Sequence, residues 1–323
     1  MKAFLRLIRI QNLVIIIITQ YIMRYCIIEP FLKINSFSLQ LSNFHFFLLV
    51  ISTILIAAAG YVINDYFDTR TDRLNRPNEV VIDKEIPRRY AILLHLIMNF
   101  IGVGIGIYLS FYIKVPGLSI VFIVTAGLLW FYSTDYKRQF LIGNILVSIM
   151  TAAVPILVIL YEMPLLNEVY GSIMIQNKAN FNYIFYWIAG FGFFAFLLTL
   201  IREIIKDMED FEGDSAYGMN TIPIILGTKS TKIILASLII VCLASILWVL
   251  VEFILFTREF VDYISGVYFS ILIFTPFIIL LTKLIFAKNK RDYYIASRLT
   301  KVIMLAGILY AFIVRYIVLI KLN

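Results

Sequence analysis

Long apolar segments alternate with short polar segments along the whole chain. Hydrophobic residues make up 62% of the sequence and charged residues 15%, whereas a soluble domain carries about a quarter charged residues. Apolar runs recur at lengths near the roughly 20 residues that a helix needs to cross the hydrocarbon core of a bilayer. The pattern predicts an all-α polytopic membrane protein. It excludes an open β-sheet, because lipid cannot satisfy the edge groups of a sheet.

The apolar segments predict nine transmembrane helices in one domain that spans residues 1–323. A bundle of eight helices is the alternative, because the connection at Val115-Pro116-Gly117 is tight and the last segment contains Arg315. The first segment follows MKAFLRLIRIQ without a small-residue cleavage site, so we expect a retained signal-anchor helix. The expected helices cover 10–30, 44–64, 90–112, 115–135, 140–161, 182–202, 231–256, 264–287 and 299–320.

Basic residues collect in the segments that would lie on one side of the membrane. If the N-terminus faces the cytoplasm, 21 of the 28 Lys and Arg residues fall in cytoplasmic segments. Such a bias predicts this orientation in a cell inner or cytoplasmic membrane. It also accounts for the net charge of +8 through contact with anionic lipid, without a nucleic-acid partner. Oligomeric state leaves no mark on the sequence.

The acidic residues form two groups with the same spacing. NDYFDTRTD (64–72) follows the second apolar segment, and KDMEDFEGD (206–214) follows the sixth. Four helices separate the two groups, so both would lie on the cytoplasmic side. Equal spacing at equivalent positions predicts a four-helix pseudo-repeat with halves at roughly 1–137 and 138–323. The first acidic set is Asp65, Asp68 and Asp72, and the second acidic set is Asp207, Asp210 and Asp214.

On a helix, the spacing of each set places three carboxylates on one stripe. Positions i, i+3 and i+7 fall within an arc of about 60°. Carboxylates this close repel one another unless they hold a cation, and oxygen ligands without nearby Cys or His favour Mg²⁺ over Zn²⁺. Mg²⁺ commonly bridges carboxylates and phosphate oxygens. Two such stripes would suit a diphosphate, and Arg202, Lys206, Lys137 and Arg138 could supply further positive charge.

Simpler interpretations of the same residues remain open. A single acidic set could be a solvated helix end in which Arg70 and Arg73 pair with neighbouring Asp residues. Lys137 and Arg138 could reflect only the excess of positive charge in cytoplasmic loops. Cys26 and Cys242 lie in apolar segments without metal spacing, and the two histidines are too few for a membrane di-iron site. The repetition of the acidic spacing favours the metal–diphosphate interpretation over the simpler ones.

Several motifs resemble the UbiA superfamily of intramembrane prenyltransferases. NDYFDTRTD fits its NDxxDxxxD motif, and REIIKDMEDFEGD (202–214) is similar to its second aspartate motif. YSTDYKRQFLIGN (132–144) resembles its loop between the fourth and fifth helices, and RIQN (9–12) resembles the start of its first helix. The resemblance implies a nine-helix bundle around a central cavity, with a prenyl diphosphate donor, Mg²⁺ as cofactor and a lipophilic or phosphorylated acceptor.

The resemblance also implies roles for individual residues. Asp65, Asp68, Asp210, Asp214 and Lys137 would be catalytic. The remaining residues carried over would hold metal, diphosphate or acceptor: Asn64, Asp72 and Asp207 at the metal, and Asn12, Asn64, Arg138, Asn144, Arg202 and Lys206 at the substrates. The aspartates would act as ligands and not as general bases.

Within the superfamily, REIIKDMEDFEGD resembles the enzymes that transfer a geranylgeranyl chain to geranylgeranylglyceryl phosphate. DRLNRP (72–77) points the same way, whereas NEVVIDKEIPRR (78–89) lacks the second Arg-Pro of that group. The alternative acceptor is an aromatic ring of the hydroxybenzoate, naphthoate or homogentisate type. A cation-coupled transporter is the alternative from another class, although both acidic sets lie at helix ends and on one side. A CDP-alcohol phosphotransferase is disfavoured, because the chain contains no Asp-Gly pair.

Overall fold

The computed structural model describes residues 2–78, 80–255 and 261–321. Nine helical segments in these ranges are long and apolar enough to cross a membrane, one for each predicted helix. The tight connection at Pro116–Leu118 and the last helix with Arg315 are both present, so the alternative of eight helices is wrong. The spans are Ile10–Ile34, Asn43–Asn75, Arg88–Tyr112, Pro116–Thr134, Ile142–Gln176, Asn182–Glu209, Ile222–Leu255, Tyr263–Phe286 and Lys290–Ile320.

Three helices extend well past the C-terminal ends of the predicted apolar segments. Helix α4 (Asn43–Asn75) has 33 residues, α7 (Ile142–Gln176) has 35 and α8 (Asn182–Glu209) has 28. At 1.5 Å per residue, α4 is about 50 Å long, compared with about 30 Å for the hydrocarbon core. The added turns of α4 and α8 are polar. The first acidic set is therefore carried on a continuous helical extension and not on a loop.

The chain divides into two compact units. The first unit comprises residues 1–137 and 153–190, and the second comprises 138–152 and 191–323. The chain passes from the first unit to the second after Lys137, returns to the first unit at Ala153 and enters the second again at Phe191. Pro155, close to the change of unit, lies inside α7, where it removes one backbone hydrogen bond. The pseudo-repeat and the central cavity stay predictions.

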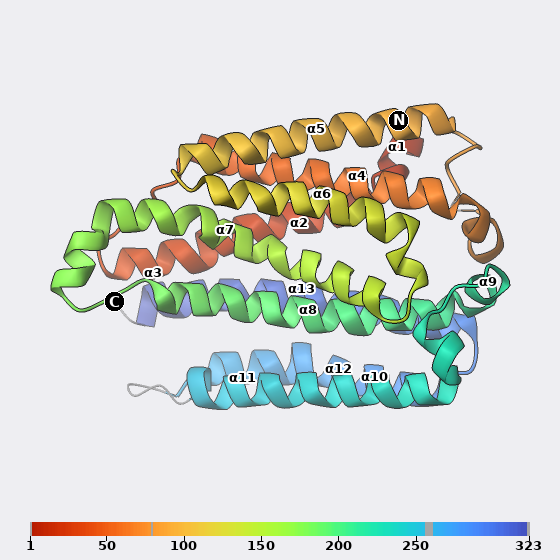
Figure 1. The fold of residues 1–323 in the computed structure, drawn as a ribbon. Helices are drawn as coiled ribbons and strands as arrows, with labels where there is room; N and C mark the ends of the chain where they lie inside the picture. Colours follow the sequence, from red (N-terminus) through yellow and green to blue (C-terminus); the bar gives the residue numbers. More distant parts are fainter. Residues whose placement is uncertain (1, 79, 256–260, 322–323) are drawn as a thin grey trace. The chain divides into compact units, whose positions relative to one another are not determined.

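In the first unit, α4 packs against α5 (Arg88–Tyr112) and α6 (Ser119–Thr134), and the three helices run side by side in Figure 1. Small residues allow the close approach. A Cβ atom at Gly60 of α4 would lie 2.8 Å from Leu129 of α6, and one at Gly102 of α5 would lie 2.9 Å from Ile56 of α4. The remaining helical segments before α4 are α1 (Lys2–Leu7), α2 (Ile10–Ile22), a π-helical turn (Met23–Ile28) and α3 (Glu29–Ile34).

A buried ion pair lies in the same unit, at the opposite end of α2 from Arg9. Arg24, in the π-helical turn, and Glu162 of α7 are both almost fully buried, and Arg24 Nη1 lies 3.7 Å from Glu162 Oε2. The Arg24 guanidinium also lies 4.4 Å from the ring centroid of Phe46. Glu162 Oε1 accepts a hydrogen bond of 3.0 Å from the Leu41 N–H. The pair therefore fastens the segment between α3 and α4 to α7.

The polar connection after α4 folds back onto the start of the chain. Val80, Val81 and Ile82 are buried, and the last two pack in one apolar cluster with Leu7 and Ile8. Burial of these side chains holds the connection against α1 and α4, where the first acidic set lies.

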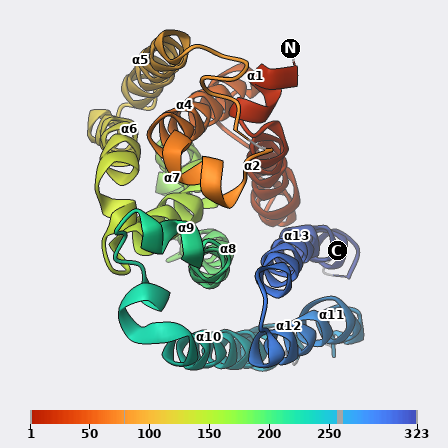
Figure 2. The ribbon, with the colours of Figure 1, turned by 90° about the vertical axis from the view of Figure 1, so that its right-hand side faces the viewer.

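The second unit is built around another apolar cluster. Ile201 and Ile204 of α8 and Leu235 of α10 (Ile222–Val249) pack in this cluster with side chains of α12 and α13. Figure 2 shows α10 beside α12. Gly227, with φ of 76°, breaks the helical geometry inside α10. The other helices of this unit are α9 (Phe211–Ala216), α11 (Tyr263–Phe269), α12 (Thr275–Phe286) and α13 (Lys290–Lys321).

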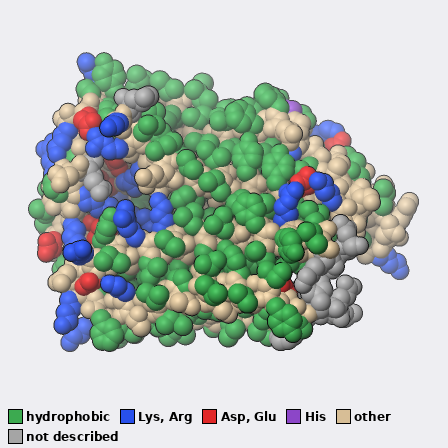
Figure 3. Space-filling view, turned by 180° about the vertical axis from the view of Figure 1, so that it is seen from behind, with side chains coloured by type: hydrophobic (Ala, Val, Ile, Leu, Met, Phe, Trp, Pro, Cys, Tyr) green, Lys and Arg blue, Asp and Glu red, His purple; other side chains and the backbone are tan. Residues whose placement is uncertain are grey.

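Hydrophobic side chains cover much of the surface. Figure 3 shows them across the middle of one face, with basic side chains gathered towards its ends. Phe100 and Phe286 are 83% and 76% exposed, which would be costly in water for side chains of this size. These side chains belong to helices of membrane length, so the exposed apolar surface suits contact with lipid.

Candidate active site

The first acidic set lies on the last three turns of α4. Asp65, Asp68 and Asp72 share one continuous helix, as their spacing predicts. The side chains of Asp65 and Asp68 are 19% and 14% exposed. Asp68 and Asp65 both repel the carboxylate of Asp72, while Arg9 and Arg76 attract it. The stripe is therefore a partly shielded region of negative charge that draws cations from other elements.

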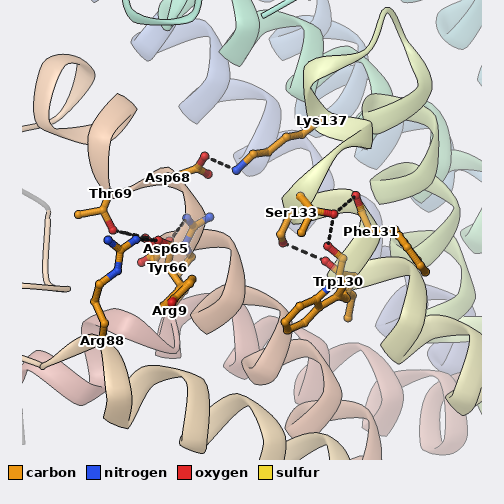
Figure 4. A network of polar contacts seen from close by, with 12 residues as sticks. Arg9, Asp65, Tyr66, Asp68, Thr69, Arg88, Trp130, Phe131, Ser133 and Lys137 are labelled. Carbon is orange, nitrogen blue, oxygen red and sulfur yellow. Dashed lines mark hydrogen bonds and ion pairs between the residues drawn. The ribbon is translucent and has the colours of Figure 1, made fainter. Parts of the chain in front are cut away.

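Arg9 supplies one of these cations. Its Nη2 donates a hydrogen bond of 2.8 Å to Asp65 Oδ1 (Figure 4). Its guanidinium lies 5.1 Å from the ring centroid of Tyr61. Arg9 lies between α1 and α2 with φ of 49°, a left-handed conformation that directs the chain into α2. Desolvation lowers the pKa of Arg9, but Asp65, Tyr61 and Asp72 outweigh it and raise the pKa above its ordinary value. Arg9 is therefore fully charged.

Lys137 supplies the second cation. It lies in a single 3-10 turn (Tyr136–Arg138) after α6, and its Nζ forms an ion pair with Asp68 Oδ1 (Figure 4). Only 9% of the Lys137 side chain is exposed. The packing of α6 against α4 brings the two residues together. Lys137 was predicted from its motif, whereas Arg9 was noted only as the start of RIQN and was not assigned to the site.

Asn64 adds a neutral amide oxygen to the same helix. Its Oδ1 is buried and has no hydrogen-bond partner. A buried amide oxygen without a donor is costly, and a cation would satisfy it. Within the described ranges, no three His, Cys, Asp or Glu side chains are gathered closely enough to hold a metal ion. Asp65 and Asp68 are instead paired with Arg9 and Lys137. The donors fit Mg²⁺ in their chemistry, since all of them are oxygens.

Arg88 connects the polar segment 76–87 to this end of α4. Its Nη2 donates a hydrogen bond of 2.9 Å to the main-chain oxygen of Tyr66, and its guanidinium lies 4.7 Å from the centroid of the Tyr66 ring. Asp83 lies 3.9 Å from Arg88 and 3.7 Å from Arg73. These contacts order the segment next to the first acidic set.

The second acidic set does not lie on one helix, so the predicted stripe is wrong for this set. Asp207 is in the last turn of α8, Asp210 lies between α8 and α9, and Asp214 is in α9. The sequence EDFEGD (209–214) places like charges three and four residues apart, which destabilises a continuous helix. The change of direction at Asp210 separates charges that one helix would have stacked.

Asp207 has a neutral partner. Asn144, in the first turn of α7, donates a hydrogen bond of 2.8 Å from Nδ2 to Asp207 Oδ2. Both residues belong to the second unit, and each was assigned to the site from a separate motif. The structure therefore brings together two predicted residues that are 63 positions apart.

Arg202 and Lys206 both form ion pairs with Glu203, an acid to which the sequence analysis assigned no role. Arg202 Nη1 and Lys206 Nζ lie 2.8 and 2.9 Å from the two oxygens of this carboxylate. Glu203 is 9% exposed. Its place between the two bases in REIIK could have suggested the pairing, because residues three apart on a helix are neighbours.

The remaining two predicted residues lie at the edges of these groups. Asn12 is half-buried on the first turn of α2, where its N–H donates a hydrogen bond of 2.8 Å to the Arg9 carbonyl. The side chain of Arg138 is exposed, and its main-chain oxygen accepts a hydrogen bond of 2.8 Å from the Asn220 N–H. Asn12 is thus next to the first acidic set along the chain, and Arg138 belongs to the second unit.

Comparison with known proteins identifies the family. The UbiA prenyltransferase family matches residues 36–293. The digeranylgeranylglyceryl phosphate synthase of Methanothermobacter thermautotrophicus is 32% identical over 243 residues, which cover 75% of this chain and 73% of that protein. The synthase of the same name from Sulfolobus acidocaldarius is 34% identical over 238 residues and covers 72% of each chain.

Solved structures share the fold. One, from work on the biosynthesis of digeranylgeranylglyceryl phosphate synthase in membranes, has a TM-score of 0.61 at 23% identity. The match covers 96% of this chain and 98% of that chain. A UbiA homolog from Archaeoglobus fulgidus bound to DMAPP and Mg²⁺ has a TM-score of 0.55 at 18% identity, with coverage of 97% and 99%. The family match sets the transporter alternative aside. The chain belongs to the UbiA prenyltransferase family and is an integral membrane prenyltransferase.

Proposed function

We propose that the protein transfers a geranylgeranyl chain from geranylgeranyl diphosphate to a hydroxyl group of geranylgeranylglyceryl phosphate, with Mg²⁺ as cofactor. The observation that carries this proposal is the identity of 32–34% to proteins named digeranylgeranylglyceryl phosphate synthase over about three quarters of the chain. The second aspartate motif, REIIKDMEDFEGD, supports the same choice of acceptor. The Archaeoglobus homolog bound to DMAPP and Mg²⁺ supports the choice of metal and of an allylic diphosphate donor.

The donor would be held by its charged head. The proposed metal ligands are Asn64, Asp65, Asp68 and Asp72 in the first unit, and Asp207, Asp210 and Asp214 in the second. When bound, Mg²⁺ would act as a Lewis acid that stabilises the charge on the departing diphosphate. Arg9 and Lys137 can donate charge-assisted hydrogen bonds to diphosphate oxygens, and such bonds are strongest where solvent is limited.

The reaction would exchange one C–O bond for another. The bond between C1 of the prenyl chain and the diphosphate oxygen breaks, and the acceptor oxygen forms an ether bond to the same carbon. The hydroxyl proton passes from the acceptor oxygen to the departing diphosphate as the new bond forms. No aspartate needs to act as a base in this scheme, because ionisation of the donor makes the carbon reactive enough for a neutral hydroxyl.

Placement at the end of α4 suits both substrates. A chain of 20 carbons is insoluble in water and would remain beside lipid, while the diphosphate head is anionic and would reach the polar turns of α4. The distribution of Lys and Arg supports a cytoplasmic location for this end, with the N-terminus on the same side.

The test is incubation of the purified full chain with geranylgeranyl diphosphate, Mg²⁺ and one acceptor at a time. Mass spectrometry would identify the products from geranylgeranylglyceryl phosphate, hydroxybenzoate, naphthoate and homogentisate. We expect the diether lipid phosphate only with the first acceptor. A prenylated aromatic ring in place of the diether would show that the proposed acceptor is wrong while the prenyltransfer activity stands.

A further inference from the structure

Two acids of the first set are neutralised by cations from distant parts of the first unit. Arg9, before α2, is 56 positions from Asp65, and Lys137, after α6, is 69 positions from Asp68. Neither contact arises from neighbouring turns of one helix. Both depend on the packing of α2 and α6 around α4, so the tertiary structure brings a cation to each carboxylate.

Both pairs are partly shielded from water, so an unpaired charge at either position would be unfavourable. The Lys137 and Asp68 side chains are 9% and 14% exposed, and those of Arg9 and Asp65 are 35% and 19% exposed. A carboxylate at this depth needs a partner, because the penalty for an unpaired buried charge exceeds the cost of keeping the pair. A metal ion that binds Asp65 and Asp68 would compete with Arg9 and Lys137 for the same carboxylates, and each displaced cation would need another anion.

We propose that Arg9 and Lys137 are exchangeable counter-cations. They hold Asp65 and Asp68 in the ligand-free protein and turn to the diphosphate when a divalent metal takes the carboxylates. The inference rests on the proposed function for the identity of the ligands. Its consequence is that metal and diphosphate bind cooperatively, each strengthening the binding of the other.

Charge balance supports the exchange. Before binding, two carboxylates face two monovalent cations. After binding, one divalent cation faces the same two carboxylates, and the released Arg9 and Lys137 face the oxygens of the diphosphate. Asp65, Asp68, Arg9 and Lys137 therefore each keep a partner of opposite charge at both stages. The side chains suit the movement, since Lys137 is a point charge on a flexible stem and Arg9 offers a planar set of donors that matches phosphate oxygens.

A binding experiment on the unmodified protein tests the proposal without any turnover. Equilibrium dialysis of the purified chain with Mn²⁺, with and without inorganic pyrophosphate, measures the metal held by the protein once a protein-free chamber has been subtracted. We expect pyrophosphate to tighten Mn²⁺ binding by about tenfold or more, and Mn²⁺ to tighten binding of labelled pyrophosphate by the same factor. Independent binding of the two ligands would overturn the proposal.

Removal of a resident cation should have opposite effects on the two ligands. In Lys137→Met and in Arg9→Met, Mn²⁺ alone should bind about tenfold more tightly, because no internal cation competes for the carboxylates. Pyrophosphate should bind more weakly and the coupling factor should fall. Lys114→Met is the matched control, because it removes a Lys from an exposed ion pair with Glu168 in the same unit. Unchanged Mn²⁺ binding in both site variants, with coupling retained, would contradict the exchange.

The two proposals can fail separately. Cooperative binding without product from any acceptor would leave the exchange standing and remove the proposed reaction. Formation of the diether by a protein that binds Mn²⁺ and pyrophosphate independently would do the reverse. If a variant does not fold, independent binding of Mn²⁺ and pyrophosphate by the unmodified protein would still overturn the exchange.

Discussion

Lys137, in the turn after α6, forms an ion pair with Asp68 on the last turns of α4. The two residues were assigned to the site from different motifs, one basic and one acidic. Their contact shows that two of the motifs shared with the family meet within a single compact unit. The same end of α4 carries Asn64, Asp65 and Asp72, so the polar chemistry of this unit is concentrated on one short stretch of helix.

Replacement of Asp65 by Asn should abolish most of the prenyltransfer activity. The variant keeps the shape of the side chain but removes the charge that would bind Mg²⁺, so kcat/KM should fall by about 100-fold or more. Product formation from geranylgeranyl diphosphate at saturating Mg²⁺ is the measurement.

Asp135→Asn is the control for this substitution. Asp135 lies directly after α6, is exposed, and accepts a hydrogen bond of 2.7 Å from Thr134. We expect near-normal turnover from this variant. Equal activity of the Asp65 variant and the control would remove the first acidic set from the mechanism.

Removal of divalent metal should stop the reaction reversibly. Treatment with a chelator should reduce product to background, and addition of Mg²⁺ should restore it, because the proposed ligands are all oxygens. Zn²⁺ should restore less, since it favours nitrogen and sulfur ligands and the proposed ligands are all oxygens. Full activity after exhaustive chelation would contradict a metal-bound diphosphate.

The sequence was sufficient to predict the helices, because apolar length alone decides which segments cross a membrane. It was less informative about where helices end. The last turns of α4 and α8 are polar, so the apolar runs end near residues 64 and 202. The helical hydrogen bonding of the backbone continues to Asn75 and Glu209. Ends of this kind depend on local packing and repulsion, as the break at Asp210 shows.

The sequence predicts which residues form the candidate site, but it predicts few of the contacts between them. Spacing and motif assign the acids, Lys137 and Asn144 to the candidate site, because chemistry restricts which residues can bind a metal or a phosphate. Arg9 was not assigned, since its approach to Asp65 depends on a left-handed turn between α1 and α2. Glu203 was also missed, although its spacing from Lys206 offered a signal.

Replacement of Asn144 by Leu should destabilise the protein. Asp207 would lose its 2.8 Å hydrogen bond while its carboxyl group stays buried. The free energy of unfolding should therefore fall by about 1–3 kcal/mol. Thermal unfolding in detergent is the measurement. Asn177→Leu is a suitable control, because that side chain is exposed and bonds only its own helix turn, so its effect should stay below about 0.5 kcal/mol. Equal loss in both variants would mean that the contact with Asp207 contributes nothing.

The buried pair of Arg24 and Glu162 should behave as a unit. Arg24→Leu or Glu162→Leu alone leaves one charge buried without its partner, which costs about 3–5 kcal/mol. The double variant should be more stable than either single variant, because it removes both charges. Unfolding midpoints of the three variants give the comparison. Lys114→Met, from an exposed pair, should change stability by less than about 1 kcal/mol. Additive losses in the double variant would show that the two charges do not interact.

The central claim is that this membrane prenyltransferase joins a geranylgeranyl chain to a phosphorylated lipid alcohol. The most direct measurement is the ratio of kcat/KM for geranylgeranylglyceryl phosphate to that for hydroxybenzoate, with geranylgeranyl diphosphate and Mg²⁺ in the same vesicles. A ratio of about 100 or more is expected, because an acceptor phosphate and an aromatic carboxylate require differently placed donors. A ratio below one, with the prenylated ring as the main product, would contradict the account.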